Sequence, residues 1–166
     1  EHNRPSGSSW YSSGNFKFAQ NPFSPTQLGV YVVSDISTYF KQRESSLEPL
    51  ASLLIELYDA RPGRYLVVFP SYHYLDMLLG VLKDKPVPLF EQRPAMSQLM
   101  LEELLGNFGR NDGFLLAVMG GSLSESLDFQ GARLDGVVAI GMGLPPPTLL
   151  RDRIADGFAT LYGRSA

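Results

Sequence analysis

Short apolar runs alternate with helical patterns along most of this chain, and that alternation constrains its fold more than any other feature. The apolar runs cover residues 65–69, 87–90, 114–118 and 136–140. Continuous runs of this length are typical of strands buried on both faces of a parallel sheet. Around them, apolar residues recur every three or four positions. This spacing predicts helices over residues 47–60, 71–82, 97–105 and 149–162. We therefore expect an α/β fold in three layers, α/β/α, with a mainly parallel sheet in the middle.

Composition narrows the class of protein further. The 166 residues have a formal net charge of -3, and 44% of them are hydrophobic, which suffices for one ordinary core. The chain has no cysteine, so disulfides, iron–sulfur clusters and thiol nucleophiles are excluded within these residues. No run approaches the roughly 20 apolar residues that span a membrane, and we expect a soluble, cytoplasmic protein. The slightly acidic balance implies that any contact with nucleic acid is local.

The ends of the chain have a different character from its middle. Residues 1–27 are rich in Ser, Gly, Asn and Pro and predict an irregular N-terminal arm, followed by one domain over residues 28–166. The first residue is Glu rather than Met, and the last residues follow a helical pattern without a stop signal. We expect this chain to be a piece of a longer protein.

Four loops are candidate sites, because ligands of parallel sheets bind at the carboxyl ends of the strands. These loops cover residues 70–74, 90–93, 119–129 and 141–147.

Several familiar catalytic patterns are missing or incomplete. No Gly-x-x-x-x-Gly-Lys-Ser/Thr phosphate loop occurs, which excludes an autonomous P-loop ATPase. Gly141 and Gly143 resemble the opening of a dinucleotide fingerprint, but prolines at residues 145–147 occupy the helix start that should offer free N–H groups. Ser122 or Ser124 with His73 would make a hydrolase pair, yet the Gly-x-Ser-x-Gly elbow is absent, and a structural contact is the more ordinary role of His73.

Two polar pairs have both a functional and a structural interpretation. Glu125 and Asp128 are three residues apart in the loop after the third strand, where they either hold a cation, receive a cationic partner or are simply solvated. Ser71 and Tyr72, at the end of a strand, offer a hydroxyl and a ring to a phosphate or base. Helix capping by Ser71 and core packing by Tyr72 explain the same residues equally well.

Taken in order, these features resemble the second motor domain of XPD/DinG-type superfamily 2 DNA helicases. Residues 63–72, Gly-Arg-Tyr-Leu-Val-Val-Phe-Pro-Ser-Tyr, resemble the family's strand-Ser-Tyr motif. Residues 115–129 resemble its Gly-x-x-x-Glu-Gly-Ile-Asp motif, and residues 136–145 match the strand and Leu-Pro turn that follow it. The start of the domain is similar too: Asn-Pro-Phe-Ser-Pro at residues 21–25 with a strand after it, then Asp-Ile-Ser-Thr-Tyr at residues 35–39 and Arg-Glu-Ser at residues 43–45.

The resemblance implies a RecA-like, P-loop NTPase-like domain without its own P-loop, which closes over ATP held by a first motor domain of the same protein. ATP and Mg²⁺ would be bound mainly by that first domain, and single-stranded DNA would be the other partner. Ser71 and Tyr72 would face the DNA. Gly120, Gly121, Glu125 and Asp128 would form the loop that couples the nucleotide cleft to the DNA. The longer protein would hydrolyse ATP, whereas this chain alone would have no catalytic residue, no metal ligand and no activity.

Two departures from the family pattern leave a second interpretation open. Ser126 stands where the family has Gly, and the Gln-x-x-Gly-Arg-x-x-Arg motif with its arginine finger is missing, as it would be in a chain truncated before it. The alternative is a free-standing RecA-like interaction or regulatory domain without motor activity.

Overall fold

The computed structural model describes residues 24–121, 123, 133–141 and 149–163. The chain divides into two compact units, Glu1–Val33 and Ser34–Ala166. The second unit contains a sheet of four strands, which are β1 (Arg64–Phe69), β2 (Leu89–Glu91), β3 (Gly113–Val118) and β4 (Gly136–Ala139). Their order is β2-β3-β1-β4, and every neighbouring pair is parallel. The parallel sheet expected from the apolar runs is thus confirmed.

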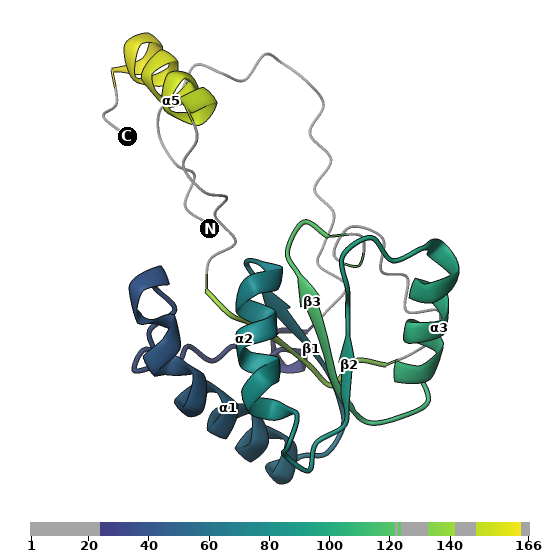
Figure 1. Cartoon of the computed structure of the whole chain (residues 1–166). Helices are drawn as coiled ribbons and strands as arrows, with labels where there is room; N and C mark the ends of the chain where they lie inside the picture. Colours follow the sequence, from purple (N-terminus) through teal and green to yellow (C-terminus); the bar gives the residue numbers. More distant parts are fainter. Residues whose placement is uncertain (1–23, 122, 124–132, 142–148, 164–166) are drawn as a thin grey trace. The chain divides into compact units, whose positions relative to one another are not determined.

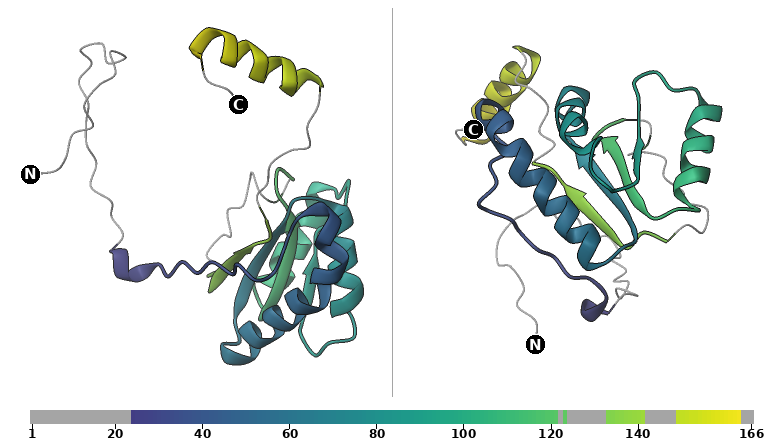
Figure 2. Two further views of the ribbon diagram at one scale, coloured as in Figure 1. Left: turned by 90° about the vertical axis from the view of Figure 1, so that its left-hand side faces the viewer. Right: turned by 60° about the horizontal axis from the view of Figure 1, so that its bottom comes forward.

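Helices cover both faces of this sheet. Helices α1 (Arg43–Ala60) and α2 (Tyr72–Leu82) lie on one face, and α3 (Gln98–Phe108) lies on the other (Figures 1 and 2). Each face has its own apolar cluster: Leu54, Leu78 and Phe114 belong to the cluster under α1 and α2, and Leu101 and Phe108 to the cluster under α3. The three-layer α/β/α architecture is confirmed.

The fourth described α-helix is α5 (Leu149–Tyr162), with the bounds that its periodicity predicts. None of the helices in the described part of the chain is long and apolar enough to cross a membrane.

Helix α1 begins earlier than its apolar spacing predicts. A 3-10 turn over Phe40–Gln42 leads directly into Arg43, and the hydroxyls of Ser45 and Ser46 both donate to the Gln42 carbonyl oxygen at 2.9 Å. Pro49 lies inside the helix and has no N–H to donate. The helix therefore starts at a local hydrogen-bonded turn rather than at its first apolar residue.

The strand expected after residue 25 is not present. In the first unit a short 3-10 turn, Pro25–Gln27, is capped by Ser24, but residues 28–33 form no strand and are exposed. β-branched residues favour strands only where a neighbouring strand pairs with their backbone and packs on their side chains. These residues have no such neighbour among those described, so the expectation of a strand was wrong.

Candidate functional site

The loops after β1 and β3 lie side by side at the carboxyl edge of the sheet. Phe69 and Val118 are register partners and are the last residues of their strands, so the chain leaves both strands at the same level. The amide of Met119 extends the pairing by donating to the Phe69 carbonyl oxygen at 2.8 Å. Ser71 and Tyr72 therefore belong to the same edge as Gly120 and Gly121, as the sequence predicted.

Ser71 caps helix α2. Its hydroxyl oxygen accepts the N–H of Tyr74 at 3.3 Å, which is the usual N-cap interaction. The side chain of Tyr72 is half-buried and packs against the cluster under α1 and α2. The capping role of Ser71 and the packing role of Tyr72 are thus confirmed. A serine hydroxyl that accepts one hydrogen bond still has a proton to donate, so capping leaves Ser71 able to bind an oxygen of a ligand.

Gly120 and Gly121 form a tight turn that excludes side chains. Gly120 has a φ of +73°, and the amide of Gly121 donates to the Val118 carbonyl oxygen at 3.0 Å. A Cβ atom on Gly121 would lie 2.9 Å from Nε2 of Gln92 and 3.0 Å from the Val118 oxygen. Because one of these atoms belongs to the backbone, a larger residue at position 121 requires the turn to move.

Gln92 joins this turn to strand β2, and the sequence analysis did not single it out. It is fully buried, its amide donates to the Leu116 carbonyl oxygen at 2.9 Å, and its Oε1 accepts the N–H of Val118 at 3.0 Å. The side-chain amide therefore continues the β2–β3 ladder beyond the last residue of β2. The one signal for Gln92 in the sequence was its place directly after a short strand. Polar residues in such places are usually exposed, so this signal did not indicate a buried role.

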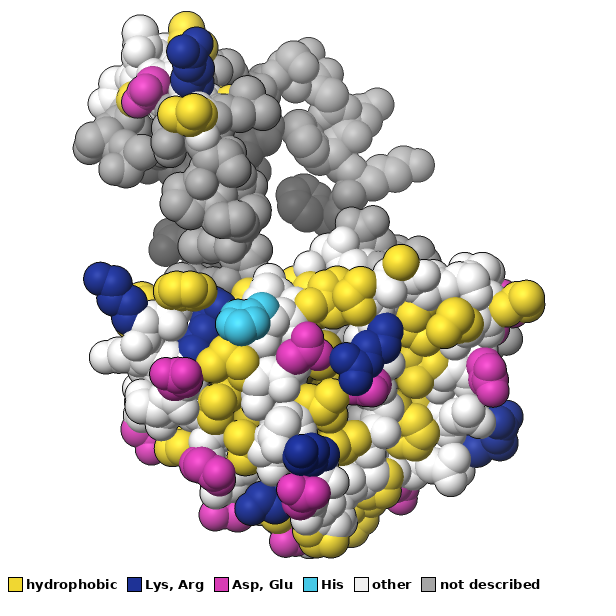
Figure 3. Space-filling view, viewed as in Figure 1, with side chains coloured by type: hydrophobic (Ala, Val, Ile, Leu, Met, Phe, Trp, Pro, Cys, Tyr) yellow, Lys and Arg dark blue, Asp and Glu magenta, His cyan; other side chains and the backbone are white. Residues whose placement is uncertain are grey.

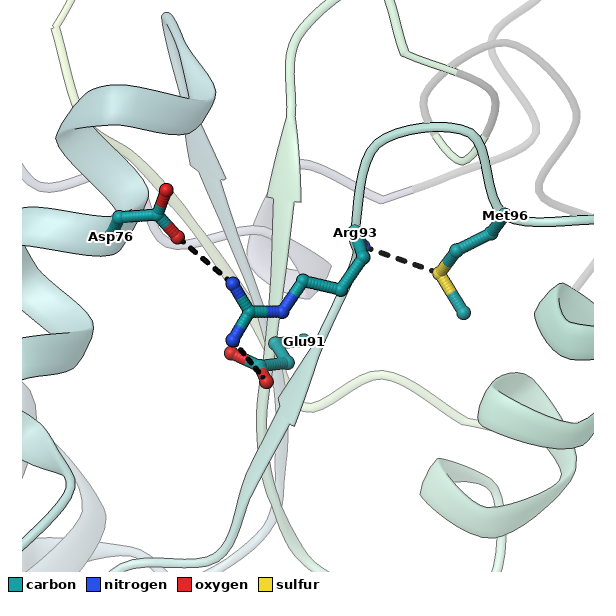
Figure 4. A network of polar contacts seen from close by, with 4 residues as sticks. All are labelled: Asp76, Glu91, Arg93 and Met96. Atoms are coloured by element: carbon teal, nitrogen blue, oxygen red, sulfur yellow. Dashed lines mark hydrogen bonds and ion pairs between the residues drawn. The ribbon is translucent and has the colours of Figure 1, made fainter.

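Arg93 is held in a network of acidic side chains, shown in Figure 4. Its guanidinium group donates to Asp76 of α2 at 3.1 Å and to Glu91 of β2 at 2.7 Å, and its amide contacts the sulfur of Met96 at 3.2 Å. Two carboxylates offset its single positive charge. Arg93 is therefore poorly suited to bind a phosphate.

An open groove of about 450 Å³ lies beside α2 and β2. Its lining residues are Asp76, Leu79, Gly80, Lys83, Leu89, Glu91 and Arg93. None of the predicted site residues is among them. Basic and acidic side chains are interspersed over the face that Figure 3 shows, in keeping with the small net charge.

Several predicted residues lie outside the described part of the chain. They are Ser122, Ser124, Glu125, Ser126 and Asp128, together with residues 142–147 of the Gly-Pro turn. Leu123 is buried in the cluster on the α3 side, so the loop after β3 passes to that face of the sheet. The coupling role of Glu125 and Asp128 remains a prediction. His73 is exposed at the start of α2, next to the residues of the β1 loop.

The described residues offer no metal site, since no group of three His, Cys, Asp or Glu side chains among them lies close enough to hold an ion.

The pKa of one titratable group near the edge is shifted. Burial raises the pKa of Tyr74, and the positive charge of Arg43 opposes this shift without cancelling it. The Tyr74 ring therefore stays neutral in the physiological pH range.

An all-parallel sheet covered by helices on both faces, with its polar loops at the carboxyl edge, is the architecture of a RecA-like domain. Residues 54–159 match the family model described as "Helicase C-terminal domain". The chain belongs to this family, as a C-terminal domain of the XPD type within superfamily 2.

Curated relatives and solved structures agree with this assignment. The chain is 24% identical over 134 residues to the ATP-dependent DNA helicase CHL1 of Debaryomyces hansenii, covering 71% of this chain and 16% of that protein. It is 25% identical over 122 residues to the ATP-dependent DNA helicase XPD of Sulfolobus acidocaldarius, covering 70% of this chain and 21% of that protein. The chain thus spans about a fifth or less of these relatives.

Two solved structures share the fold. One is a structure titled as an XPD helicase, with a TM-score of 0.60 and 24% identity, covering 75% of this chain and 22% of that one. The other is Xpd4 of S. tokodaii, with a TM-score of 0.56 and 22% identity, covering 78% of this chain and 24% of that one. Both agree with the RecA-like fold of the second unit.

Proposed function

We propose that this chain is the second motor domain of an ATP-dependent DNA helicase, which closes over ATP held by a first motor domain and contacts single-stranded DNA. In such a machine ATP favours the closed pair of domains, and hydrolysis releases it, so that the strand moves between them. Membership of the helicase C-terminal family supports the assignment to a motor domain. The DNA contact and the closure over ATP are the parts that need testing.

The Ser71 hydroxyl is the observation that carries the DNA contact. Its oxygen accepts the Tyr74 amide, so the helix cap does not use the hydroxyl proton. Phosphate oxygens are such acceptors, and contacts to phosphates suit a motor because they do not depend on base sequence. Tyr72 flanks Ser71 with a half-buried ring, which packs on the core and supports the loop.

The nucleotide would be held mainly by residues of the other domain. This chain has no phosphate loop, and its described residues have no acidic cluster for Mg²⁺. The Gly120–Gly121 turn carries no side chains, so a nucleotide could come close to its backbone. Such a turn can lie against a nucleotide, but it has no side-chain groups that would bind one. ATP and Mg²⁺, when bound, would supply the phosphoryl-transfer chemistry. The part of this chain in that step would be to close the cleft and exclude water.

The test is Ser71→Asp, measured by fluorescence anisotropy with a labelled single-stranded oligothymidine at low salt. Aspartate caps a helix as well as serine does, so stability should change little. It cannot donate a proton, and its charge repels phosphate. We expect at least about a tenfold loss of affinity, corresponding to roughly 1.4 kcal/mol.

Ser97→Asp is the matched control, because Ser97 caps α3 by the same interaction with the amide of Met100 at 3.4 Å. Its affinity for the oligonucleotide should equal that of the unmodified chain. Equal binding by the Ser71 and Ser97 variants would return Ser71 to a purely structural role. An unmodified chain that binds no single strand at all would favour the interaction or regulatory domain instead.

A further inference from the structure

A second cluster at the carboxyl edge lies partly before the region that matches the family model. It is built from Phe40, Arg43 and Tyr74, with Tyr39 next to Phe40 along the chain, and we call it the Arg43 cage. The guanidinium carbon of Arg43 lies 4.6 Å from the centre of the Tyr74 ring and 5.3 Å from that of the Phe40 ring. The family match begins at residue 54. Residues 39–43 therefore have no role assigned by that match.

Local hydrogen bonds fix the segment that presents Arg43. Nε of Arg43 donates to the Thr38 carbonyl oxygen at 3.4 Å, and the amide of Gln42 donates to the Tyr39 oxygen at 2.8 Å. The Ser37 hydroxyl also donates to the Gln42 side chain. The guanidinium group is thus held by two rings and a carbonyl before any ligand arrives, which lowers the entropy lost on binding.

The positive charge of Arg43 has no acidic partner among the described residues. This distinguishes it from Arg93, which contacts two carboxylates on the same edge of the sheet. Lys41, exposed two residues earlier, adds a second positive charge to the segment. Glu44, the next residue after Arg43, is also exposed, so the case for an anion rests on the unpaired guanidinium group of Arg43 and not on a basic patch.

Two aromatic side chains of the cage face solvent. Tyr39 is 79% exposed and Phe40 is 75% exposed. Exposed rings beside an arginine are the arrangement by which proteins bind single-stranded nucleic acid, with bases stacked on the rings and phosphates on the basic group. A partner protein would also cover exposed rings, but would not require an arginine without a carboxylate.

The cage lies beside the candidate site. Tyr74, which forms its floor, is the residue whose amide donates to Ser71. On the other side, Oγ1 of Thr38 lies 3.0 Å from the position that a Cβ atom on Gly141 would occupy, so the segment reaches the end of β4. The cage and the Ser71 hydroxyl therefore share the carboxyl edge of the sheet.

We propose that the Arg43 cage binds one nucleotide unit of a single-stranded nucleic acid. Arg43 contacts a phosphate through its free terminal nitrogens, and Tyr39 and Phe40 stack on neighbouring bases. This inference rests on the proposed function and extends it by a second contact, displaced along the edge from Ser71. Because stacking and phosphate contacts are both tolerant of base identity, the site discriminates little between sequences.

The test measures the binding of labelled oligothymidine over a series of salt concentrations, for the 166-residue chain and four variants. Arg43→Gln should weaken binding about tenfold and reduce the slope of log K against log salt by about 0.7, the value for one phosphate contact on a single strand. Phe40→Ala should weaken binding by a similar factor without changing the slope, because stacking releases no counterion. Arg110→Gln, at an exposed arginine after α3, should leave affinity and slope unchanged.

Arg43→Lys guards against a loss of folding, since it keeps the charge but not the planar stacking surface. It should retain the salt slope at reduced affinity.

If the unmodified chain binds the oligonucleotide and the Arg43 and Phe40 variants match it in affinity and slope, the cage is not a binding site, and the role of Ser71 stands. If the unmodified chain binds no oligonucleotide, both proposals fail. If Arg43→Gln lowers the affinity for fluorescent ATP and not for DNA, the cage takes a free nucleotide and the present assignment is wrong.

Discussion

At the scale of single residues, neighbouring positions at the carboxyl edge have unlike surroundings. Gln92 is buried and completes a strand ladder, while the adjacent Arg93 is exposed and paired with two carboxylates. Arg43 has no acidic partner among the described residues and is held by aromatic rings. The sequence presents all three as polar residues near a helix or strand end. Only the contacts in the structure show that Gln92 has a structural role, that the charge of Arg93 is neutralised and that Arg43 is available to a phosphate.

Replacing Gln92 with leucine should lower the free energy of unfolding by about 1 to 3 kcal/mol, because the Val118 N–H would lose its acceptor inside the core. Urea denaturation measures the change. Gln98→Leu, on α3, removes a side-chain bond to Glu102 at an exposed site and should change stability by less than about 0.5 kcal/mol. A similar stability for both variants would mean that the buried amide contributes nothing to the ladder.

At the scale of elements, the periodicity of apolar residues predicted most of the fold. The strands at residues 65–69 and 114–118 and the helix over residues 149–162 were predicted to within one residue. Alternation also predicted the parallel sheet and the edge that carries the loops. The order β2-β3-β1-β4 was not predictable, because strand order depends on which apolar faces meet in three dimensions. The wrong strand at residues 28–33 has a similar cause, since a strand needs a partner that its own sequence does not specify.

Helix α1 contains a proline that its packing does not require. Pro49 is exposed, lacks a backbone N–H and occupies the helix interior. Pro49→Ala should therefore raise the free energy of unfolding by about 1 to 3 kcal/mol in urea denaturation. Ser52→Ala, at an exposed position one turn later, should raise it by no more than about 0.5 kcal/mol. A destabilised Pro49 variant would show that the proline fixes the start of the helix.

At the scale of the whole molecule, the chain has the RecA-like architecture of its helicase C-terminal family. It provides a sheet edge with a hydroxyl donor, a turn without side chains and a caged arginine, but no phosphate loop. The position of Ser71, Tyr72, Gly120 and Gly121 at one edge of the sheet was predictable from the strand ends. The Arg43 cage was not, because it joins a turn before α1 to the first turn of α2 through ring contacts that no motif encodes.

In the proposed helicase, where this chain is joined to a first motor domain, Asp128→Ala should reduce DNA-stimulated ATP hydrolysis by about 5- to 150-fold, the usual range of coupling between two sites. The basal rate and the thermal unfolding of the protein should be unchanged. Asp84→Ala, at an exposed position after α2, serves as the control and should keep full stimulation. Full stimulation of the Asp128 variant would remove this residue from the coupling loop.

The double use proposed for the Ser71 hydroxyl would restrict which residues can occupy that position. Aspartate would still cap the helix but has no proton to donate, asparagine would cap it but could donate only from a longer amide, and alanine or glycine would offer no donor. Threonine alone among the other residues combines both capacities without a longer side chain. In helicases that share this edge, we therefore expect serine and threonine to interchange at this position and other good caps to be rare.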